Sequence, residues 1–275
     1  MFNFFFDTAD IEYIRKVWEK VSQYFTPQNI VGITTNPNAM DKEGLTTLES
    51  WEQHLPKLCA LVTELRGDGQ GVVYVQMPNS RMSADDALAW AKHISQFTDG
   101  SSQLGLKIPP LPEILNIVPQ LNEIMQTNVT GVSDAATALS CFSFGPRYVS
   151  IIPGRMAEVG IVPEDHLLLA QQRSTQQPIS EIISGSMRTL EGLSLTVRAK
   201  TVPTIGCRVW DSIIENPEVL ETVDWVSPLR RIFPIEVVVD ERNHNLSRDF
   251  FIQMDDLGQS VYEDWRGRLN KLKTK

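Results

Sequence analysis

Short hydrophobic runs alternate along this chain with longer stretches in which hydrophobic and polar residues repeat with a helical period. The runs have the length of strands and lie at residues 2–8, 30–36, 71–77, 104–110, 127–133, 147–153, 180–186 and 200–206. The stretches with apolar residues at i, i+3, i+4 and i+7 include 10–25, 51–66, 84–97, 111–126, 133–144 and 187–199. Strands that alternate with helices form βαβ units of a parallel sheet.

Eight such repeats in 275 residues indicate a closed (β/α)8 TIM barrel, a fold that typically needs about 250 residues. The rival fold is an open, doubly wound sheet, which usually carries a glycine-rich phosphate loop after an early strand. Neither G-x-G-x-x-G nor G-x-x-x-x-G-K-[ST] occurs in this sequence. We therefore predict the α/β class, with one TIM-barrel domain over residues 1–275.

Residues 222–256 break the alternation of strand and helix. They contain an additional strand-like run, FPIEVVV at 233–239, and precede a final predicted helix at 259–273. The segment is too short to bury a core of its own. We interpret it as an insertion on the barrel rather than an independent domain, and a scaffolding role for it stays open.

Composition limits the classes of partner. Hydrophobic residues make up 42% of the chain and charged residues 21%, which is ordinary for a globular protein. A net charge of −9 argues against a nucleic-acid surface, because binding to a phosphate backbone needs a clustered positive field. An acidic protein can still bind a small phosphate where a few basic residues converge.

Cysteines and histidines give no sign of a disulfide framework or a metal site. Cys59, Cys141 and Cys207 are odd in number and widely spaced, which favours a reducing compartment. The first hydrophobic run ends at Asp7 without a basic region before it, and no run approaches the roughly 20 apolar residues of a membrane span. We expect a cytoplasmic protein with no metal ion, because no ligand spacing joins its histidines, His54, His93, His166 and His244.

Polar side chains stand where the predicted strands end. In a TIM barrel the carboxyl ends of all strands face the active site, so these side chains meet at one mouth. They are Asp7, Thr34, Asn36, Gln76, Lys107, Asn128, Thr130, Ser150, Ser184 and Ser186. The sequence therefore predicts a polar pocket at that mouth.

Lys107 lies in the apolar run LGLKIPP, where two interpretations compete. Either its ammonium reaches water just outside the strand, or the fold holds an amine inside for chemical use. Convergence of the other polar strand ends favours the second interpretation. An amine surrounded by apolar walls loses its proton near neutral pH and attacks a carbonyl as a Schiff-base nucleophile.

Two further groups have both a structural and a chemical interpretation. Asp7 precedes a predicted helix and could cap it, but a lysine nucleophile opposite favours a general base. Arg155 and Arg188 could form surface ion pairs. Because they follow neighbouring late strands together with Ser186, a phosphate site is the favoured interpretation.

Six motifs, in order along residues 2 to about 220, resemble those of the transaldolase family, which includes a fructose 6-phosphate aldolase branch. The motifs are FFFDTAD, VGITTNPNAM, LKIPP, TNVT, YVSIIPGRM and IISGSMR. Near the end of the chain, VYEDWRGR is similar to the C-terminal helix of the aldolase branch.

This resemblance implies class I aldol chemistry with no cofactor. Lys107 would form the Schiff base, and Asp7 would take the proton of the C4 hydroxyl. Thr130 and Gln76 would occupy the positions that hold the catalytic water. The substrate hydroxyls would be held by Thr34, Asn36, Asn128 and Ser150, and the phosphate by Arg155, Ser186 and Arg188.

The resemblance also implies the partners. We expect sugar phosphates of the pentose phosphate pathway as substrates, a homo-oligomer as the assembly, and neither nucleic acid nor membrane. The pattern departs from the family at two positions: Gln76 replaces the glutamate of transaldolases, and Ile152 replaces the tyrosine of the aldolase branch. Transfer of a dihydroxyacetone unit is the favoured activity. Aldolase-like cleavage and a non-catalytic barrel that binds sugar phosphates stay open as alternatives.

Overall fold

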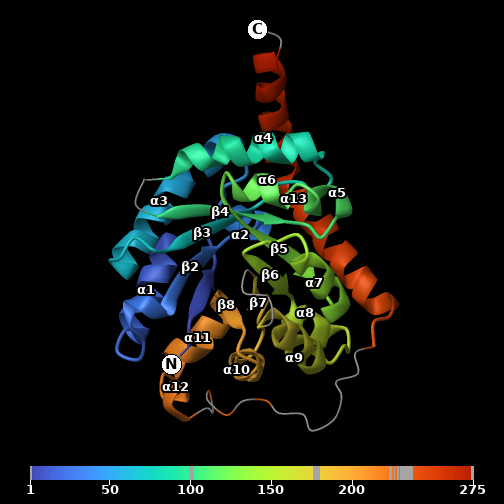
Figure 1. The fold of residues 1–275 in the computed structure, drawn as a ribbon. Helices are drawn as coiled ribbons and strands as arrows, with labels where there is room; N and C mark the ends of the chain where they lie inside the picture. The colour runs from blue at the N-terminus through green and yellow to red at the C-terminus, as the bar shows by residue number, and fades with distance from the viewer. Residues whose placement is uncertain are drawn as a thin grey trace.

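The strands of the barrel follow one another in chain order. The computed structural model describes residues 2–98, 102–175, 180–222, 225, 227, 229 and 238–273. All pairings are parallel, and β8 closes the barrel by pairing with β1 (Figure 1). The strands are β1 (Phe4–Asp7), β2 (Ile30–Thr34), β3 (Val72–Gln76), β4 (Gln103–Ile108), β5 (Gln126–Val132), β6 (Tyr148–Ile151), β7 (Glu181–Ser184) and β8 (Val202–Gly206). The predicted (β/α)8 TIM barrel is confirmed.

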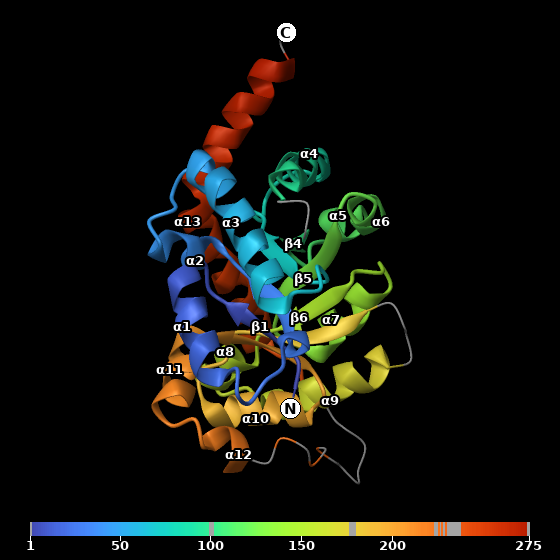
Figure 2. The ribbon, with the colours of Figure 1, turned by 90° about the vertical axis from the view of Figure 1, so that its left-hand side faces the viewer.

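Helices cover the outside of this barrel (Figures 1 and 2). Those before β6 are α1 (Ile11–Val21), α2 (Pro37–Lys42), α3 (Leu48–Arg66), α4 (Ala84–Ile94), α5 (Pro112–Leu115), α6 (Val118–Asn122) and α7 (Ala135–Phe142). Those after β6 are α8 (Pro153–Glu158), α9 (Pro163–Ser174), α10 (Leu190–Arg198), α11 (Cys207–Glu215), α12 (Val219–Thr222) and α13 (Glu241–Lys273). Short 3-10 helices, η1 (Pro27–Asn29) and η2 (Ser95–Phe97), precede β2 and β4.

One expected helix is broken in two. The periodic stretch at 111–126 forms α5 and α6, which are separated at Asn116 and Ile117. Pro119 has no amide hydrogen to donate to the carbonyl four residues earlier, so a continuous helix would lose a hydrogen bond there. The prediction of a single helix was wrong for this reason.

The last helix is longer than the sequence pattern predicts. It begins at Glu241 rather than near residue 259, so residues 241–256 of the segment that breaks the rhythm are helical. Of the strand-like run at 233–239, residues 233–237 lie outside the described residues, and Val238 and Val239 are not in a strand. The helix packs against α2, α3, α8 and β5, and its C-terminal end extends beyond the barrel (Figure 2).

An aromatic cluster fills the amino-terminal half of the barrel interior. The rings of Phe5, Tyr74 and Tyr148 meet edge to face, with centroids 5.8–5.9 Å apart. The buried side chains of Val72 and Ile183 complete the cluster. This packing closes the bottom of the barrel against water.

A polar layer lies directly above the aromatic one. Side chains of a strand alternate between its two faces, so a residue two positions beyond an inward-facing one also faces inward. Asp7 stands two residues after Phe5 in this way, and Ser150 stands two residues after Tyr148. The strands therefore place their terminal polar side chains inside the carboxyl end of the barrel.

Gly105 makes room for this arrangement at Lys107. It is paired with Tyr74 across β3 and β4, and Lys107 is paired with Gln76 two residues further along both strands. A Cβ atom on Gly105 would lie 2.3 Å from Cε1 of Tyr74. Because glycine leaves that space empty, the Tyr74 ring can lie under the lysine.

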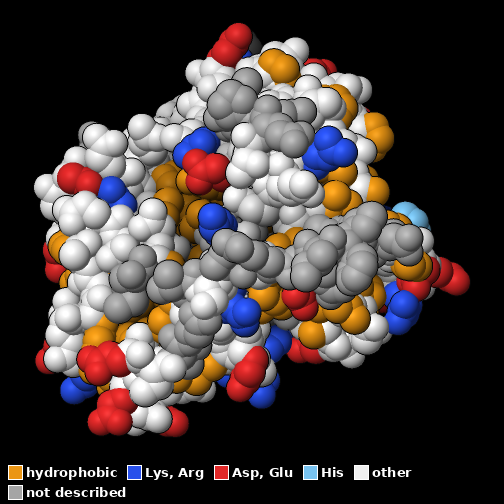
Figure 3. Space-filling model, turned by 60° about the horizontal axis from the view of Figure 1, so that its bottom comes forward, with side chains coloured by type: hydrophobic (Ala, Val, Ile, Leu, Met, Phe, Trp, Pro, Cys, Tyr) orange, Lys and Arg blue, Asp and Glu red, His pale blue; other side chains and the backbone are white. Residues whose placement is uncertain are grey.

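The surface carries charges of both signs. On the face shown in Figure 3, the coloured Lys and Arg side chains lie among Asp and Glu side chains rather than in one cluster. Within the described ranges, no helix combines the length and the continuous hydrophobicity that crossing a bilayer requires.

Gly105→Ala is expected to lower the free energy of unfolding by about 1–3 kcal/mol, because the methyl group overpacks the Tyr74 ring. Urea unfolding would measure the change. Gly267→Ala is the matched control, since nothing lies within 4 Å of a Cβ atom at this helical position. That variant should be neutral or more stable by up to about 1 kcal/mol. Equal stability of the two variants would contradict the proposed role of Gly105.

Candidate active site

A small cavity lies inside the barrel at the carboxyl ends of the strands. Its volume is about 20 Å³, and most of the predicted site residues line it. The lining consists of Asp7, Thr34, Asn36, Lys107, Asn128, Thr130, Ser150, Ile152, Gly185, Ser186, Thr204 and Phe250. We call it the inner cavity.

A wider pocket adjoins the inner cavity on the outside. Its volume is about 290 Å³, and it is the place where the predicted phosphate ligands Arg155 and Arg188 lie. We call it the outer pocket. The two spaces share the lining residues Asp7, Asn36, Ser186 and Phe250. A ligand that spans both would reach from the arginines to the end of β4.

Lys107 is buried inside the inner cavity. The residue is 6% exposed, and its Nζ donates a hydrogen bond to the carbonyl oxygen of Thr35 at 3.1 Å. Burial lowers the pKa of Lys107 from its ordinary value, and the negative charge of Asp7 opposes the shift. More of the amine is therefore neutral at physiological pH, which is the form that attacks a carbonyl.

Asp7 is not engaged in capping a helix. The residue that caps α1 is Asp10, whose carboxylate accepts a hydrogen bond from the amide of Tyr13 at 2.9 Å. Asp7 accepts a hydrogen bond from Oγ1 of Thr34 at 2.9 Å instead. Its carboxylate thus lines the same cavity as Lys107 and is oriented by Thr34.

Amides and hydroxyls make up the rest of the polar lining. Ser150 donates a hydrogen bond to Oδ1 of Asn128 at 2.8 Å, and Nδ2 of Asn128 is buried without a partner in the described structure. Oδ1 of Asn36 caps α2 by accepting from the amide of Ala39 at 2.9 Å. These contacts orient the amide groups before any substrate is present.

Two of the polar strand ends lie outside both spaces. Gln76 is buried and is paired with Lys107 across the strands, yet it lines neither the inner cavity nor the outer pocket. Its Oε1 is buried without a partner in the described structure. Ser184 shares a hydrogen bond of 2.6 Å with Thr201 and is likewise absent from both linings.

The two arginines of the outer pocket have different partners. Nε of Arg188 donates to Glu158 at 2.9 Å. Arg155 donates from Nη2 to Gln253 at 3.1 Å, while its Nε is buried without a partner in the described structure. Burial and the neighbouring charge of Arg188 lower the pKa of Arg155. An anion between the arginines would offset both effects.

The backbone of this region is tightly packed. Ser186 has a φ of 55°, in the left-handed region that residues other than glycine rarely occupy. Its carbonyl oxygen lies so close to Gly154 that a Cβ atom there would be 1.7 Å away. The start of α8, which carries Arg155, is therefore held in one position relative to Ser186.

Sequence reasoning missed several residues of the outer pocket. Arg208 is the second residue after β8, in the first turn of α11, and extending the strand-end rule to this strand would have identified it. Lys42 lies on α2, away from any strand end. Phe250 and Gln253 come from α13, and no pattern in the sequence connects that helix with the mouth of the barrel.

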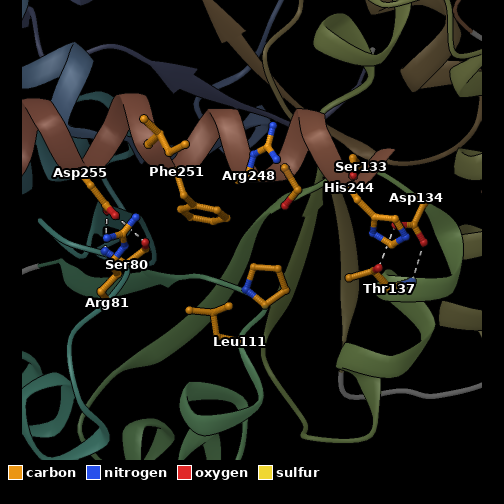
Figure 4. Close-up of a pocket in the computed structure, with 13 residues that line it drawn as sticks. Ser80, Arg81, Leu111, Ser133, Asp134, Thr137, His244, Arg248, Phe251 and Asp255 are labelled. Atoms are coloured by element: carbon orange, nitrogen blue, oxygen red, sulfur yellow. Dashed lines mark hydrogen bonds between the residues drawn. The ribbon is translucent and has the colours of Figure 1, made fainter. Parts of the chain in front are cut away.

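Another pocket, of about 460 Å³, lies between α13 and the loops that follow β3, β4 and β5 (Figure 4). Its carboxylates are already engaged. Asp255 accepts two hydrogen bonds of 2.6 Å from Ser80, and Asp134 caps α7. The described lining contains no lysine, so this pocket offers no amine for carbonyl chemistry. The inner cavity is the better candidate for an active site.

Comparison with known proteins agrees with this assignment. The model of a family described as Transaldolase/Fructose-6-phosphate aldolase matches residues 4–250. The "Probable transaldolase 2" of Bacillus anthracis is 26% identical over 220 residues, which cover 78% of this chain and 90% of that protein. The "Probable transaldolase" of Streptococcus equi subsp. equi is 28% identical over 219 residues, which cover 78% and 91%.

Lys107→Met is expected to stabilise the fold by an amount that depends on pH. Because burial lowers the pKa of Lys107, the unfolded chain binds more protons than the folded protein between the lowered pKa and that of free lysine. The free energy of unfolding of the parent therefore rises with pH across this window. The advantage of the Met variant should shrink between about pH 7 and about pH 10 in urea unfolding experiments.

Lys16→Met provides the control, since Lys16 is an exposed lysine on α1. Its effect on the free energy of unfolding should stay constant over the same pH range. A constant advantage for Lys107→Met would mean that the amine is hydrated in the folded protein.

Proposed function

The chain belongs to the transaldolase/fructose-6-phosphate aldolase family, and on this premise we propose that it transfers a dihydroxyacetone unit from a ketose phosphate to an aldose phosphate. One observation carries the proposal. The buried amine of Lys107, with its lowered pKa, shares a small polar cavity with the carboxylate of Asp7. A neutral amine and a carboxylate are the two groups that aldol cleavage through a Schiff base requires.

In the first half of the reaction, Nζ of Lys107 attacks the C2 carbonyl of the ketose, and loss of water leaves a protonated Schiff base. Asp7 accepts the proton of the C4 hydroxyl as the C3–C4 bond breaks. The electron pair of that bond moves into the Schiff base and forms an enamine, and the aldehyde fragment departs. The hydrogen bond from Thr34 supports this role, because it orients the carboxylate of Asp7.

In the second half, the enamine carbon attacks the carbonyl of the acceptor aldose phosphate. Asp7 returns its proton to the new alkoxide, and water hydrolyses the Schiff base to release the longer ketose phosphate. We propose Thr130 and Gln76 as the groups that orient this water. The unpartnered Oε1 of Gln76 supports the assignment, since a water could donate a hydrogen bond to it.

Substrate binding would divide between the two spaces. In the inner cavity, Thr34, Asn36, Asn128 and Ser150 would hold the hydroxyls of the sugar. In the outer pocket, Arg155, Ser186 and Arg188 would hold the phosphate. Arg155 supports this division. It is partly buried and has no carboxylate partner in the described structure, so a phosphate could accept a hydrogen bond from its unpartnered Nε.

We further propose that the reaction takes place in the cytoplasm and that the enzyme is a homo-oligomer. Cys59, Cys141 and Cys207 form no disulfide among the described residues, in agreement with a reducing compartment. The reaction as written requires no cofactor, because the amine of Lys107 itself accepts the electron pair of the broken bond through the Schiff base.

Borohydride trapping tests the proposal directly. Borohydride reduces the Schiff base to a stable secondary amine, so fructose 6-phosphate should label the parent protein at Lys107, as located by peptide mass analysis. Lys107→Met should remove the label, whereas Lys42→Met, which removes a neighbouring amine, should still be labelled at Lys107. A parent protein that binds fructose 6-phosphate without being labelled would be a non-catalytic barrel.

Ile152→Tyr is expected to shift the balance from transfer to cleavage. Simple cleavage requires protonation of the enamine carbon, and Ile152, which is 2% exposed and lines the inner cavity, has no proton to give. A phenol there could hold a water together with Thr130. General acid–base assistance is typically worth about 10²–10⁴-fold, so even a poorly placed phenol should accelerate cleavage measurably.

The measurement is the ratio of transfer to cleavage of fructose 6-phosphate, with and without an aldose phosphate acceptor. Ile152→Leu is the matched control and should keep the ratio of the parent. If the Tyr variant has the same ratio as the parent, Ile152 does not decide between the two reactions.

A further inference from the structure

Phe250 is one of four residues that line both the inner cavity and the outer pocket, and it is the one large hydrophobic residue among them. It is 5% exposed. With the ring in place, the inner cavity of about 20 Å³ has room for about one water molecule. A dihydroxyacetone unit is several times larger than a water molecule. A ketose therefore needs more room at Lys107 than this structure offers, and displacement of Phe250, which lines both spaces, would provide it.

The position of Phe250 is fixed by two neighbours. Gly131, with a φ of +73°, allows α13 to approach β5: a Cβ atom there would lie 2.9 Å from Cδ1 of Phe250. On the other side, the guanidinium of Arg155 stacks on the Phe250 ring, 5.0 Å from its centroid. Arg155 also donates to Gln253, one turn further along the same helix.

Arg155 is a cation whose partners are weak compared with a phosphate. Among the described residues it bonds no carboxylate, and its Nε has no partner. A charge-assisted, two-pronged contact with a phosphate is stronger than a neutral amide contact and a stack on an aromatic ring. A phosphate in the outer pocket would therefore draw Arg155 away from Phe250 and release the ring.

We infer that Phe250 is a specificity-determining residue, which keeps the Lys107 cavity closed until the phosphate of a substrate engages Arg155. The phosphate of a phosphorylated ketose would itself release Phe250. An unphosphorylated ketose has no such group, so Phe250 would stay over the Lys107 cavity. This role rests on the proposed function, and it deepens that function by making access to the amine depend on the phosphate. The inference also gives a function to residues 241–256 of α13, which include both Phe250 and Gln253.

Trapping rates with matched donors provide the test. Fructose and fructose 6-phosphate differ only in the phosphate, and the rate of borohydride labelling at Lys107 reports access without need of an acceptor. Phe250→Leu removes the aromatic face and opens the cavity, so labelling by fructose should accelerate. The preference for fructose 6-phosphate should fall by about two- to thirty-fold, the range to which a cation–π contact corresponds.

Two variants serve as controls. Phe250→Tyr keeps an aromatic face for Arg155, and its preference should stay close to that of the parent. Phe251 is the next residue on α13, and Figure 4 shows it pointing into the other pocket, toward Leu111. Phe251→Leu should therefore leave the preference unchanged, although both rings pack against Gly131.

A second measurement gives its main result in the parent protein, so that result does not depend on whether a variant folds. Inorganic phosphate should accelerate labelling of Lys107 by dihydroxyacetone, because it engages Arg155 and releases Phe250. In Phe250→Leu the same addition should have no accelerating effect. Labelling that phosphate does not accelerate in the parent, or an unchanged donor preference in Phe250→Leu, would overturn the inference. Absence of any labelling in the parent would instead refute the proposed function.

Discussion

A lysine ammonium loses most of its hydration when it is buried inside a barrel. The chemistry of this site depends on that loss, because it lowers the pKa of Lys107. The aromatic cluster of Phe5, Tyr74 and Tyr148 closes the barrel below Lys107, and Phe250 lines the cavity above it. Nζ donates its hydrogen bond to one backbone carbonyl, that of Thr35, and the negative charge of Asp7 offsets only part of the cost of burial. The amine becomes a nucleophile because the surrounding fold does not solvate its proton.

Close backbone packing places the charged groups around that amine. Gly105 has no side chain, so the Tyr74 ring occupies its space and Lys107 rises above the ring. Gly154 similarly allows the Ser186 carbonyl to approach the start of α8, which brings Arg155 beside the loop after β7. In both places a side chain as small as a methyl group would separate the elements that bear the chemistry.

An acidic chain can bind an anion because electrostatics at a pocket are local. The net charge of −9 describes the whole surface, whereas the outer pocket gathers Arg155, Arg188 and Arg208 from separate elements. Charges more than about 10 Å apart are largely screened at ordinary ionic strength, so distant carboxylates affect this pocket little. Helix α13 contributes to the linings of both spaces through Phe250.

The sequence by itself determined the barrel and the ring of polar strand ends. Both follow from local rules: hydrophobic periodicity reports each element, and the carboxyl ends of parallel strands meet at one edge. The segment LGLKIPP left the direction of Lys107 open, because an apolar strand end permits either burial or exposure. Tertiary structure decided that point through the register with Tyr74, and it alone brought in Phe250. A contact between α13 and β5 depends on packing at Gly131, more than 100 residues away along the chain, and no local pattern carries that information.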